Sequence, residues 1–458
     1  MLACMLSQHH DAIQSVLANL REHLQSPAFA ALARHRDHPR AFTRSRKLPL
    51  PKLVACLCGF RGGSVQSELD SFFAHMGTGL DVLRSISDRA LAKARAKLHV
   101  PALWALNAHL IRQMQLQGLL PLWKGRRLVC ADATVLAPAQ RACQRTRHLA
   151  APTQRALGLY LPTNEVMLHV SVGPESEGER QMLFDQLDLL QPGDVLVLDR
   201  GYPATWLVQL LHQRGIDFII RCDSTRGWAA AQKLLRSGSE ECWAYLGATH
   251  ADKVATWELD GPAQMHIRLV RHVSSSGSIR VMVTSLDQRM ATVAELADLY
   301  HGRWRIEEAF KRLKHRLGLE SVSGLSQHAL LVDVATKVLA DNLVTLLNQA
   351  VLLPDAVEAD PMPLQDADTD AKTGAESLCA KKIPRTKVTH KVNRALAAKT
   401  LSRCVGRLLL HIDSLPVLIH QWAFAMRRSL IRHIQGRSQP RNNTRHKPHP
   451  SQAYKRAA

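Results

Sequence analysis

The pattern that most restricts the fold of this chain is a series of short apolar runs that begins at about residue 124. The runs RRLVCADATVLA, ALGLYL, VMLHVSV, DVLVLD and DFIIRC are β-rich, and their length predicts strands. Two helical patterns lie among them, and the second, PATWLVQLLHQRG, opens with Pro203 and closes at Gly215, as helices often do. Close-set strands followed by β-α-β units indicate an α/β protein with a mixed sheet covered by helices.

The segments on either side have other patterns. Residues 7–120 read as helices with arginines and lysines among them, which is typical of helical domains that bind DNA and of many that do not. Residues 223–290 begin with one short helix and continue with CWAYL, KVATWEL, MHIRLVRHV and SIRVMVTSL, which alternate like an antiparallel β insert. We therefore expect a helical N-terminal domain (1–120), the first part of an α/β domain (121–222), a β-rich insertion (223–290), a helix and the end of the α/β domain (291–350), an acidic and polar linker (351–387) and a helical C-terminal segment with a basic tail (388–458).

Composition narrows the class of protein. A chain of 458 residues is too long for one typical core, and 46% apolar with 22% charged residues fits a soluble globular protein. The chain has no uninterrupted apolar run of about 18 residues, so we expect no membrane span. Its start lacks a basic leader followed by a long apolar stretch, so we expect no secretion. Nine scattered cysteines without a CxxC pair argue against a zinc cluster and for reduced thiols in the cytoplasm.

Charge is the strongest global property. The formal net charge of +21 and the isoelectric point near 10.0 point to a polyanionic partner. Nucleic acid is the first candidate, an anionic membrane surface is the second, and a merely basic, well-solvated surface is the third reading. Residues 355–376 are acidic and are expected to form a linker, whereas residues 427–458 are basic and without acids, as in tails that bind nucleic acid or stay solvated.

Two aspartates are expected to end two separate apolar strands of the predicted sheet. Asp132 comes after Leu-Val-Cys-Ala, and Asp199 comes after Val-Leu-Val-Leu at the expected carboxyl end of its strand. Ligands of open α/β sheets bind beyond the carboxyl ends of strands, and a buried carboxylate needs a partner. A helix cap or a salt bridge, for example between Asp199 and its neighbour Arg200, is the simpler reading of either residue alone.

A third carboxylate lies on a predicted helix over residues 299–320, LYHGRWRIEEAFKRLKHRLGLE. At about 100° per residue its apolar side chains form one stripe, and a second stripe beside it carries Tyr300, Arg303, Glu307 and Lys314. We prefer Glu307 to Glu308, which lies about 100° away from this stripe. The simpler reading of the stripe is an exposed ion pair between Arg303 and Glu307. Trp304 is expected in the core.

Three carboxylates that converge on one point would bind one or two hard divalent cations through oxygen. Mg²⁺ or Mn²⁺ fits this set better than Zn²⁺, because no histidine or cysteine accompanies it. The residues concerned are Asp132, Asp199 and Glu307.

At this point the sequence resembles a known family. The motifs ADAT, DRGY and Tyr-x2-Arg-x3-Glu-x6-Lys, in this order, resemble the insertion sequence 4 family of DDE transposases over about residues 45–345. A β-rich insert lies between the second aspartate and the glutamate in that family, as residues 223–290 do here. Ala133 stands where glycine or serine is frequent, which matters little if only a small side chain is required.

The resemblance implies a ribonuclease-H-like catalytic fold and specific roles for residues. It implies a catalytic and metal-binding triad of Asp132, Asp199 and Glu307. It implies contacts with phosphates of the transposon end by Tyr300, Arg303 and Lys314, and places Arg200 and Tyr202 at the edge of the active site near the cleaved strand.

The family reaction cleaves strands at the ends of the element and joins the freed 3′-hydroxyl to target DNA. The partners implied are double-stranded DNA of the terminal inverted repeats and of the target, two Mg²⁺ or Mn²⁺ ions, and a second subunit in a homodimer on DNA, in the bacterial cytoplasm near the nucleoid. The helical N-terminal region is the candidate for recognition of the repeats. The alternatives are a metal-dependent nuclease of the same fold and a domesticated, inactive DNA-binding protein; a membrane-surface protein would need an amphipathic anchor that the sequence does not offer.

Overall fold

A computed structural model describes most of the chain. The described residues are 2–44, 47–77, 86–138, 153–222, 228–247, 264–274, 277–351, 388–410 and 413–434. The expected strand KVATWEL, most of the expected linker and most of the basic tail lie outside these residues.

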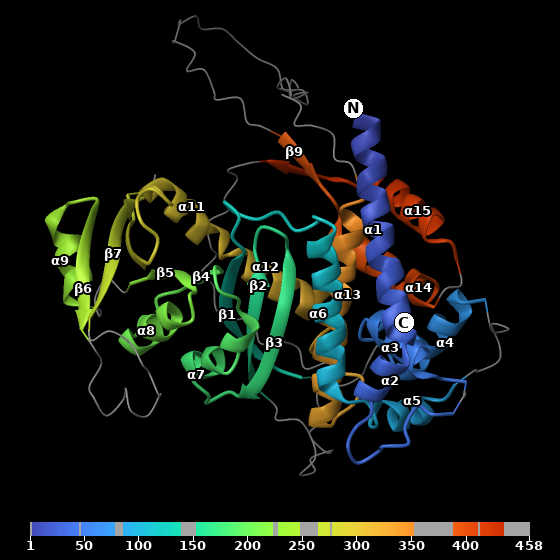
Figure 1. Ribbon diagram of the computed structural model, residues 1–458. Coiled ribbons are helices and arrows are strands. Elements are labelled where there is room, and N and C mark those ends of the chain that lie inside the picture. Colours follow the sequence, from blue (N-terminus) through green and yellow to red (C-terminus); the bar gives the residue numbers. More distant parts are fainter. Residues whose placement is uncertain are drawn as a thin grey trace, which may run out of the picture.

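The centre of the molecule is an eight-stranded sheet with the strand order β3-β2-β1-β4-β5-β8-β7-β6 (Figure 1). Its strands are β1 (Leu128–Leu136), β2 (Gln154–Leu161), β3 (Val166–Pro174), β4 (Val195–Leu198), β5 (Asp217–Arg221), β6 (Glu241–Gly247), β7 (Gln264–Val273) and β8 (Ile279–Thr284). β1, β2 and β3 are antiparallel neighbours, and β4 and β5 run parallel to β1. The prediction of a mixed, ribonuclease-H-like sheet is confirmed.

Both faces of this sheet are covered, as the unbroken apolar run of β4 predicts. Val195 and Val197 pack on the side of α11 (Val293–Gly302) and α12 (Arg305–Lys311). The intervening Leu196 and Leu198 belong to the cluster on the other side. That second side is covered by α7 (Glu179–Phe184), the 3-10 helix Leu187–Leu189, α8 (Thr205–Gln213) and α9 (Ala229–Ser237).

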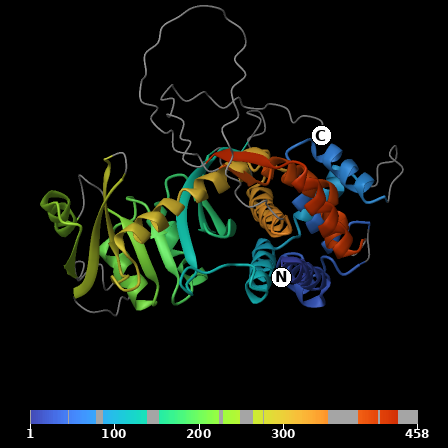
Figure 2. The same ribbon diagram turned by 90° about the horizontal axis from the view of Figure 1, so that it is seen from above.

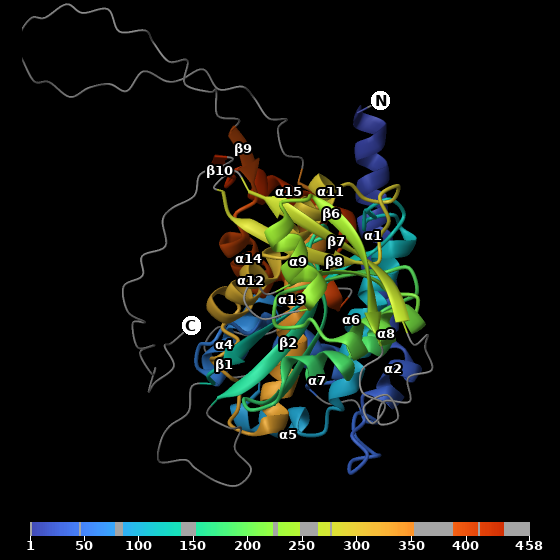
Figure 3. The same ribbon diagram turned by 90° about the vertical axis from the view of Figure 1, so that its left-hand side faces the viewer.

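The expected β insertion continues the main sheet. β8 pairs antiparallel with β5, β7 with β8, and β6 with β7, so the hydrogen-bond ladder is unbroken from β3 to β6. Figure 3 looks onto the β6 end of the sheet, where α9 packs on β6, β7 and β8. The insertion is therefore joined to the part of the sheet formed by β1 to β5 through backbone hydrogen bonds.

Helices from both ends of the chain form a layer beside the β3 edge of the sheet (Figure 2). α1 packs on α6, α14 and α15, and α14 packs on α3 and α13, so the N-terminal and C-terminal helices share one hydrophobic cluster. The division into functional domains stays a prediction. The members of the layer are α1 (Leu2–Gln25), α2 (Pro27–Leu32), α3 (Leu50–Gly59), α4 (Val65–His75), α5 (Asp88–Arg95), α6 (Val100–Leu116), α13 (Gln327–Asn348), α14 (Arg394–Leu409) and α15 (Leu415–Arg427), with a small sheet of β9 (Val388–Lys391) and β10 (Ile431–Ile434).

Two buried asparagines attach this layer to the free edge of β3. The side-chain carbonyl of Asn342 on α13 accepts the backbone N–H of Met167 at 2.9 Å, and its NH2 group donates to the Met167 carbonyl at 2.8 Å. Asn107 on α6 donates to the carbonyls of Met167 and Leu168 at 3.2 and 3.0 Å. The amide of Asn342 thus satisfies the backbone groups that another strand would satisfy, so the edge is closed by helices.

Within the described part of the chain, no helix has both the length and the apolar character needed to cross a bilayer.

Candidate active site

Asp132 and Asp199 lie side by side on neighbouring parallel strands. Cys130 of β1 is in register with Val197 of β4, and each aspartate follows two residues later. Asp199 directly follows β4, as predicted. The prediction that Asp132 also ends its strand is wrong: β1 continues to Leu136, because its second half pairs with β2. Asp132 nevertheless emerges beside Asp199, since β4 ends and leaves that edge of β1 open.

The predicted single helix over residues 299–320 is divided in the structure. α11 ends at Gly302, and α12 begins at Arg305. Between them the N–H groups of Arg303 and Trp304 bond three residues back, to Tyr300 and His301, which tightens this turn to 3-10 geometry. A tighter turn rotates each residue by more than 100°, so the angular argument does not apply across it.

The helix also changes at its far end. Residues 312–316 form a π-helix, and Gly318 follows with a φ of +62°, where a Cβ would lie 2.5 Å from the carbonyl oxygen of Arg61. Glycine ends the helix here because a side chain would clash at that left-handed position. Lys314 lies in the widened π turn, so its position relative to Glu307 differs from that in a regular α-helix.

The structure brings the three predicted carboxylates around one guanidinium, that of Arg303. Its Nη1 lies 3.1 Å from Asp132, and its Nη2 lies 3.6 Å from Asp199 and 3.7 Å from Glu307. The Arg303 side chain is only 4% exposed. Glu308 instead pairs with Lys311 on the surface, with 65% of its side chain exposed, which supports the preference for Glu307.

Asp199 is held by more partners than the other two carboxylates. The Tyr300 hydroxyl donates to its Oδ1 at 2.7 Å, and the Arg221 guanidinium on β5 lies 3.9 Å from the same oxygen. Burial alone would raise the pKa of Asp199, but the Tyr300 hydrogen bond, the Arg200 backbone N–H and the charges of Arg303 and Arg221 bring it below its ordinary value. Asp199 is therefore an ionised, oriented acceptor.

Asp132 is in a different environment. Burial raises its pKa to about 6, because the cation Arg303 and the Ala133 N–H only partly offset desolvation and the nearby acids Glu307 and Glu179. A divalent cation would supply more positive charge to this carboxylate than the single charge of Arg303 does.

The oxygen donors therefore fit Mg²⁺ or Mn²⁺ chemically. In their present positions they surround Arg303, and among the described residues no group of three or more acidic, histidine or cysteine side chains is close enough to coordinate a metal.

The five residues expected to contact DNA differ in how much of their surface is exposed. Arg200 is exposed beside Asp199, whereas Tyr202, Tyr300 and Arg303 are buried, with 1%, 2% and 3% of their surfaces exposed. The Lys314 ammonium donates to the Val135 carbonyl at 2.5 Å. Arg200 and Lys314 thus lie nearest the surface, and a DNA contact by the buried three requires movement. The assignment of all five stays a prediction.

The prediction that Trp304 lies in the core is wrong. Its side chain is 38% exposed, and the Arg303 guanidinium carbon lies 6.0 Å from its ring centroid. The tight turn between α11 and α12 rotates Trp304 outward, away from the apolar stripe.

Sequence reasoning missed three charged residues near the site. Arg221 ends β5 next to Asp199, and Glu179 begins α7 within electrostatic range of Asp132. Glu320 pairs with Lys314 at 3.6 Å and accepts the Ala137 N–H, which joins the end of the helix to the end of β1. Arg221 could have been identified from the sequence, since it follows the apolar run DFII at the end of a predicted strand. No sequence pattern indicates that Glu179 or Glu320 lies near the site.

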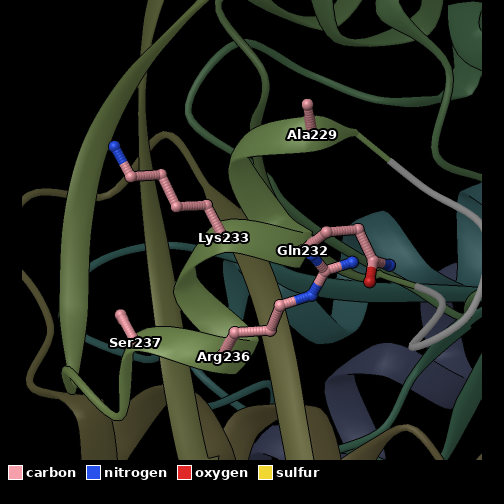
Figure 4. A pocket seen from close by; sticks show the side chains of 5 residues that line it. All are labelled: Ala229, Gln232, Lys233, Arg236 and Ser237. Atoms are coloured by element: carbon pink, nitrogen blue, oxygen red, sulfur yellow. The ribbon is translucent and has the colours of Figure 1, made fainter.

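A separate hollow of about 560 Å³ lies along α9 (Figure 4). Its lining residues all belong to this helix, which packs on the opposite face of the sheet from α11. The hollow is thus distinct from the acidic site, and Lys233 and Arg236 give its wall a positive charge.

Gly158 on β2 lies close to α12, and replacing it tests how α12 packs on the sheet. Gly158 on β2 is in register with Asp132, and a Cβ there would lie 2.9 Å from Phe310 on α12 and 3.1 Å from Met167. We expect Gly158→Ala to displace α12, and with it Glu307, and to lower the free energy of unfolding by about 1–3 kcal/mol.

Thermal unfolding and a DNA-cleavage assay measure the two effects of Gly158→Ala. The control is Gly178→Ala, where nothing lies within 4 Å of the added Cβ. Equal thermal midpoints for the two variants would show that α12 does not press on β2 as described.

A ribonuclease-H-like sheet with carboxylates gathered at the ends of its central strands is typical of enzymes that act on nucleic acids. Residues 123–343 match the family described as the transposase DDE domain, and this span includes β1 to β8 and the three carboxylates. This match supports a transposase, an enzyme that acts on DNA. Such domains generally use divalent metal ions.

No curated protein matches the sequence. The solved structure of the piggyBac transposase synaptic complex with hairpin DNA aligns over 72% of this chain and 76% of that chain, with 9% identity and a TM-score of 0.37.

Proposed function

We propose that this transposase belongs to the insertion sequence 4 group, binds the terminal inverted repeats of its element, cleaves the DNA at the ends and joins the 3′-hydroxyl to target DNA. One observation carries the proposal: within the residues that match the transposase DDE domain, Asp132, Asp199 and Glu307 surround one guanidinium, that of Arg303. The proposal includes a homodimer on DNA, since two ends must be cut and joined.

In this proposal Asp132, Asp199 and Glu307 hold Mg²⁺ or Mn²⁺ ions. When bound, the ions activate the attacking water or 3′-hydroxyl and stabilise the leaving oxygen. Tyr300 and Arg221 fix the orientation of the Asp199 carboxylate.

Other groups bind the DNA backbone in this proposal. Arg200 and Lys314 position phosphates, which contributes affinity that depends on salt but carries no base sequence. The N-terminal helices recognise the repeats.

The test uses purified protein and a labelled duplex that carries the DNA flanking its own gene, assayed with Mg²⁺, with Mn²⁺ and with EDTA. Metal-dependent cuts at the repeat ends, followed by joined products on a target plasmid, would establish transposition. Cuts without joining would favour a nuclease of the same fold, and binding without cuts in either metal would favour an inactive DNA-binding protein.

Lys314 gives a separate prediction about DNA binding. Its ammonium is anchored by the Val135 carbonyl and Glu320 at the rim of the site. If it also contacts a phosphate, Lys314→Ala should weaken end binding and reduce the slope of log K against log salt by about 1. Fluorescence anisotropy at several NaCl concentrations measures the slope.

The control for Lys314→Ala is Lys124→Ala. Lys124 is a half-exposed lysine that pairs with Glu295 in the first turn of α11. An unchanged slope for Lys314→Ala, equal to that of Lys124→Ala, would rule out the phosphate contact. Thermal unfolding of both variants checks that the fold is retained.

A further inference from the structure

Arg303 is in an unusual position for a residue expected to bind DNA. Its guanidinium is buried among three carboxylates and cannot reach an external phosphate as placed. It is a monovalent cation at the point where the carboxylates of the proposed metal site converge. Its charge and a divalent cation at that point would repel each other, so the two cannot share the position at low cost.

The guanidinium is held there by charge more than by fitted hydrogen bonds. Its Nε and Nη1 atoms are buried and have no hydrogen-bond acceptor among the described residues, although Asp132 lies 3.1 Å from Nη1. Strong arginine-carboxylate pairs make two parallel, aligned hydrogen bonds, and none of the three carboxylates here does so. Buried donors that lack acceptors cost free energy, so this arrangement is one that a competing cation can displace.

The structure also provides a place to which the guanidinium can move. Arg303 lies in the tight turn between α11 and α12, with its guanidinium carbon 5.8 Å from the Tyr300 ring and 6.0 Å from the Trp304 ring. Trp304 is 38% exposed, so a guanidinium that moved toward its outer edge would lie nearer the molecular surface.

We propose that Arg303 occupies the metal position in the metal-free protein and leaves it when a divalent cation binds, moving toward Trp304 and a DNA phosphate. This rests on the proposed metal-binding role of the three carboxylates. The consequence is coupling: DNA that receives the guanidinium strengthens metal binding, and metal strengthens DNA binding by the same factor. The site is thereby kept neutralised until DNA and metal are present together.

The test measures Mn²⁺ binding to the full chain without DNA, by electron paramagnetic resonance of the unbound ion. Arg303→Gln should bind Mn²⁺ at least tenfold more tightly than the wild type, because the competing charge is gone. Arg303→Lys keeps the charge and should stay near the wild-type affinity. Asp132→Asn, which removes a proposed ligand, should bind at least tenfold more weakly.

Two outcomes of this titration would overturn the inference. They differ in whether the proposed metal site is still supported. If Arg303→Gln binds no more tightly than the wild type while Asp132→Asn loses binding, the metal site stands and the displacement does not. If Asp132→Asn and the wild type bind Mn²⁺ equally, the carboxylates are not the metal site, and the proposed function fails together with the inference.

A second variant keeps the test decisive if Arg303→Gln does not fold. Trp304 is partly exposed, so its replacement disturbs the core less. Trp304→Ala removes the surface on which the displaced guanidinium rests, and we expect Mn²⁺ to bind about threefold more weakly. An unchanged Mn²⁺ affinity in a folded Trp304→Ala protein would contradict the displacement.

Discussion

Glu307→Gln is expected to lower the rate of DNA cleavage by at least about 10³-fold, which corresponds to ~4 kcal/mol of transition-state stabilisation, while DNA binding is retained. Glutamine has nearly the same volume but supplies no negative charge to a metal ion. Arg303 keeps its contacts with Asp132 and Asp199 in this variant, so the buried guanidinium remains neutralised and the helix stays in place. Single-turnover cleavage of labelled end DNA in Mg²⁺ and in Mn²⁺ measures the effect.

The same loss is expected for Asp132→Asn and Asp199→Asn. The matched control is Glu308→Gln, one residue along the same helix, whose carboxylate is 65% exposed and pairs with Lys311. Glu308→Gln should cleave within about threefold of the wild type, because an exposed ion pair contributes well under 1 kcal/mol. Metal-dependent cleavage by Glu307→Gln within tenfold of the wild-type rate would remove Glu307 from the triad.

Asp341→Ala is expected to lower the free energy of unfolding by about 3–5 kcal/mol. Asp341 on α13 lies 3.1 Å from the Arg312 guanidinium, which also donates to the Tyr160 hydroxyl at 3.2 Å. Both charged side chains are at most 10% exposed, and Asp341 raises the pKa of Arg312 far above its ordinary value despite burial. Without Asp341 the guanidinium is a buried charge with no counter-ion. Urea denaturation followed by circular dichroism measures the loss.

Two further variants show whether the loss of stability comes from a buried, unpaired charge. Asp188→Ala removes an ion pair with Arg214 whose carboxylate is 88% exposed, and it should cost less than about 1 kcal/mol. The double variant Arg312→Met, Asp341→Leu should recover most of the loss, because it leaves no buried charge. A loss below 1 kcal/mol for Asp341→Ala alone would contradict a buried, mutually dependent pair.

The sheet and its two aspartates could be predicted because their signals are local. Four consecutive apolar residues before Asp199 require a strand covered on both faces, and the structure has that strand as β4. The end of β1 could not be predicted in the same way. Its last residues are strand because β2 pairs with them, and β2 is separated from β1 by a segment that the local pattern does not place.

The form of the helix that carries Glu307 depends on distant residues. The π turn at residues 312–316 contains Arg312, whose partners are Tyr160 on β2 and Asp341 on α13. Both partners lie outside residues 299–320, so the pattern of apolar residues within this segment could not indicate them. That pattern alone predicts one regular helix. The continuation of the sheet through the β8–β5 pair is likewise a long-range contact, and the alternating pattern of the insertion does not specify it.

The burial of Arg303 was the least predictable feature of the site. Its spacing of four residues from Glu307 is also that of an exposed ion pair, which is far more common. Only the register of β1 and β4, which brings Asp132 and Asp199 together under the turn, makes a buried guanidinium tolerable there.

The central claim, that these three carboxylates form the metal centre of the transposase, is tested most directly by locating the metal. The measurement is the anomalous scattering of Mn²⁺ in crystals of the protein bound to end DNA with an unreactive 3′-end. We expect Mn²⁺ at about 2.0–2.2 Å from oxygens of Asp132, Asp199 and Glu307, with the Arg303 guanidinium withdrawn from Asp132. Mn²⁺ bound elsewhere, with Arg303 still between the carboxylates, would contradict the account.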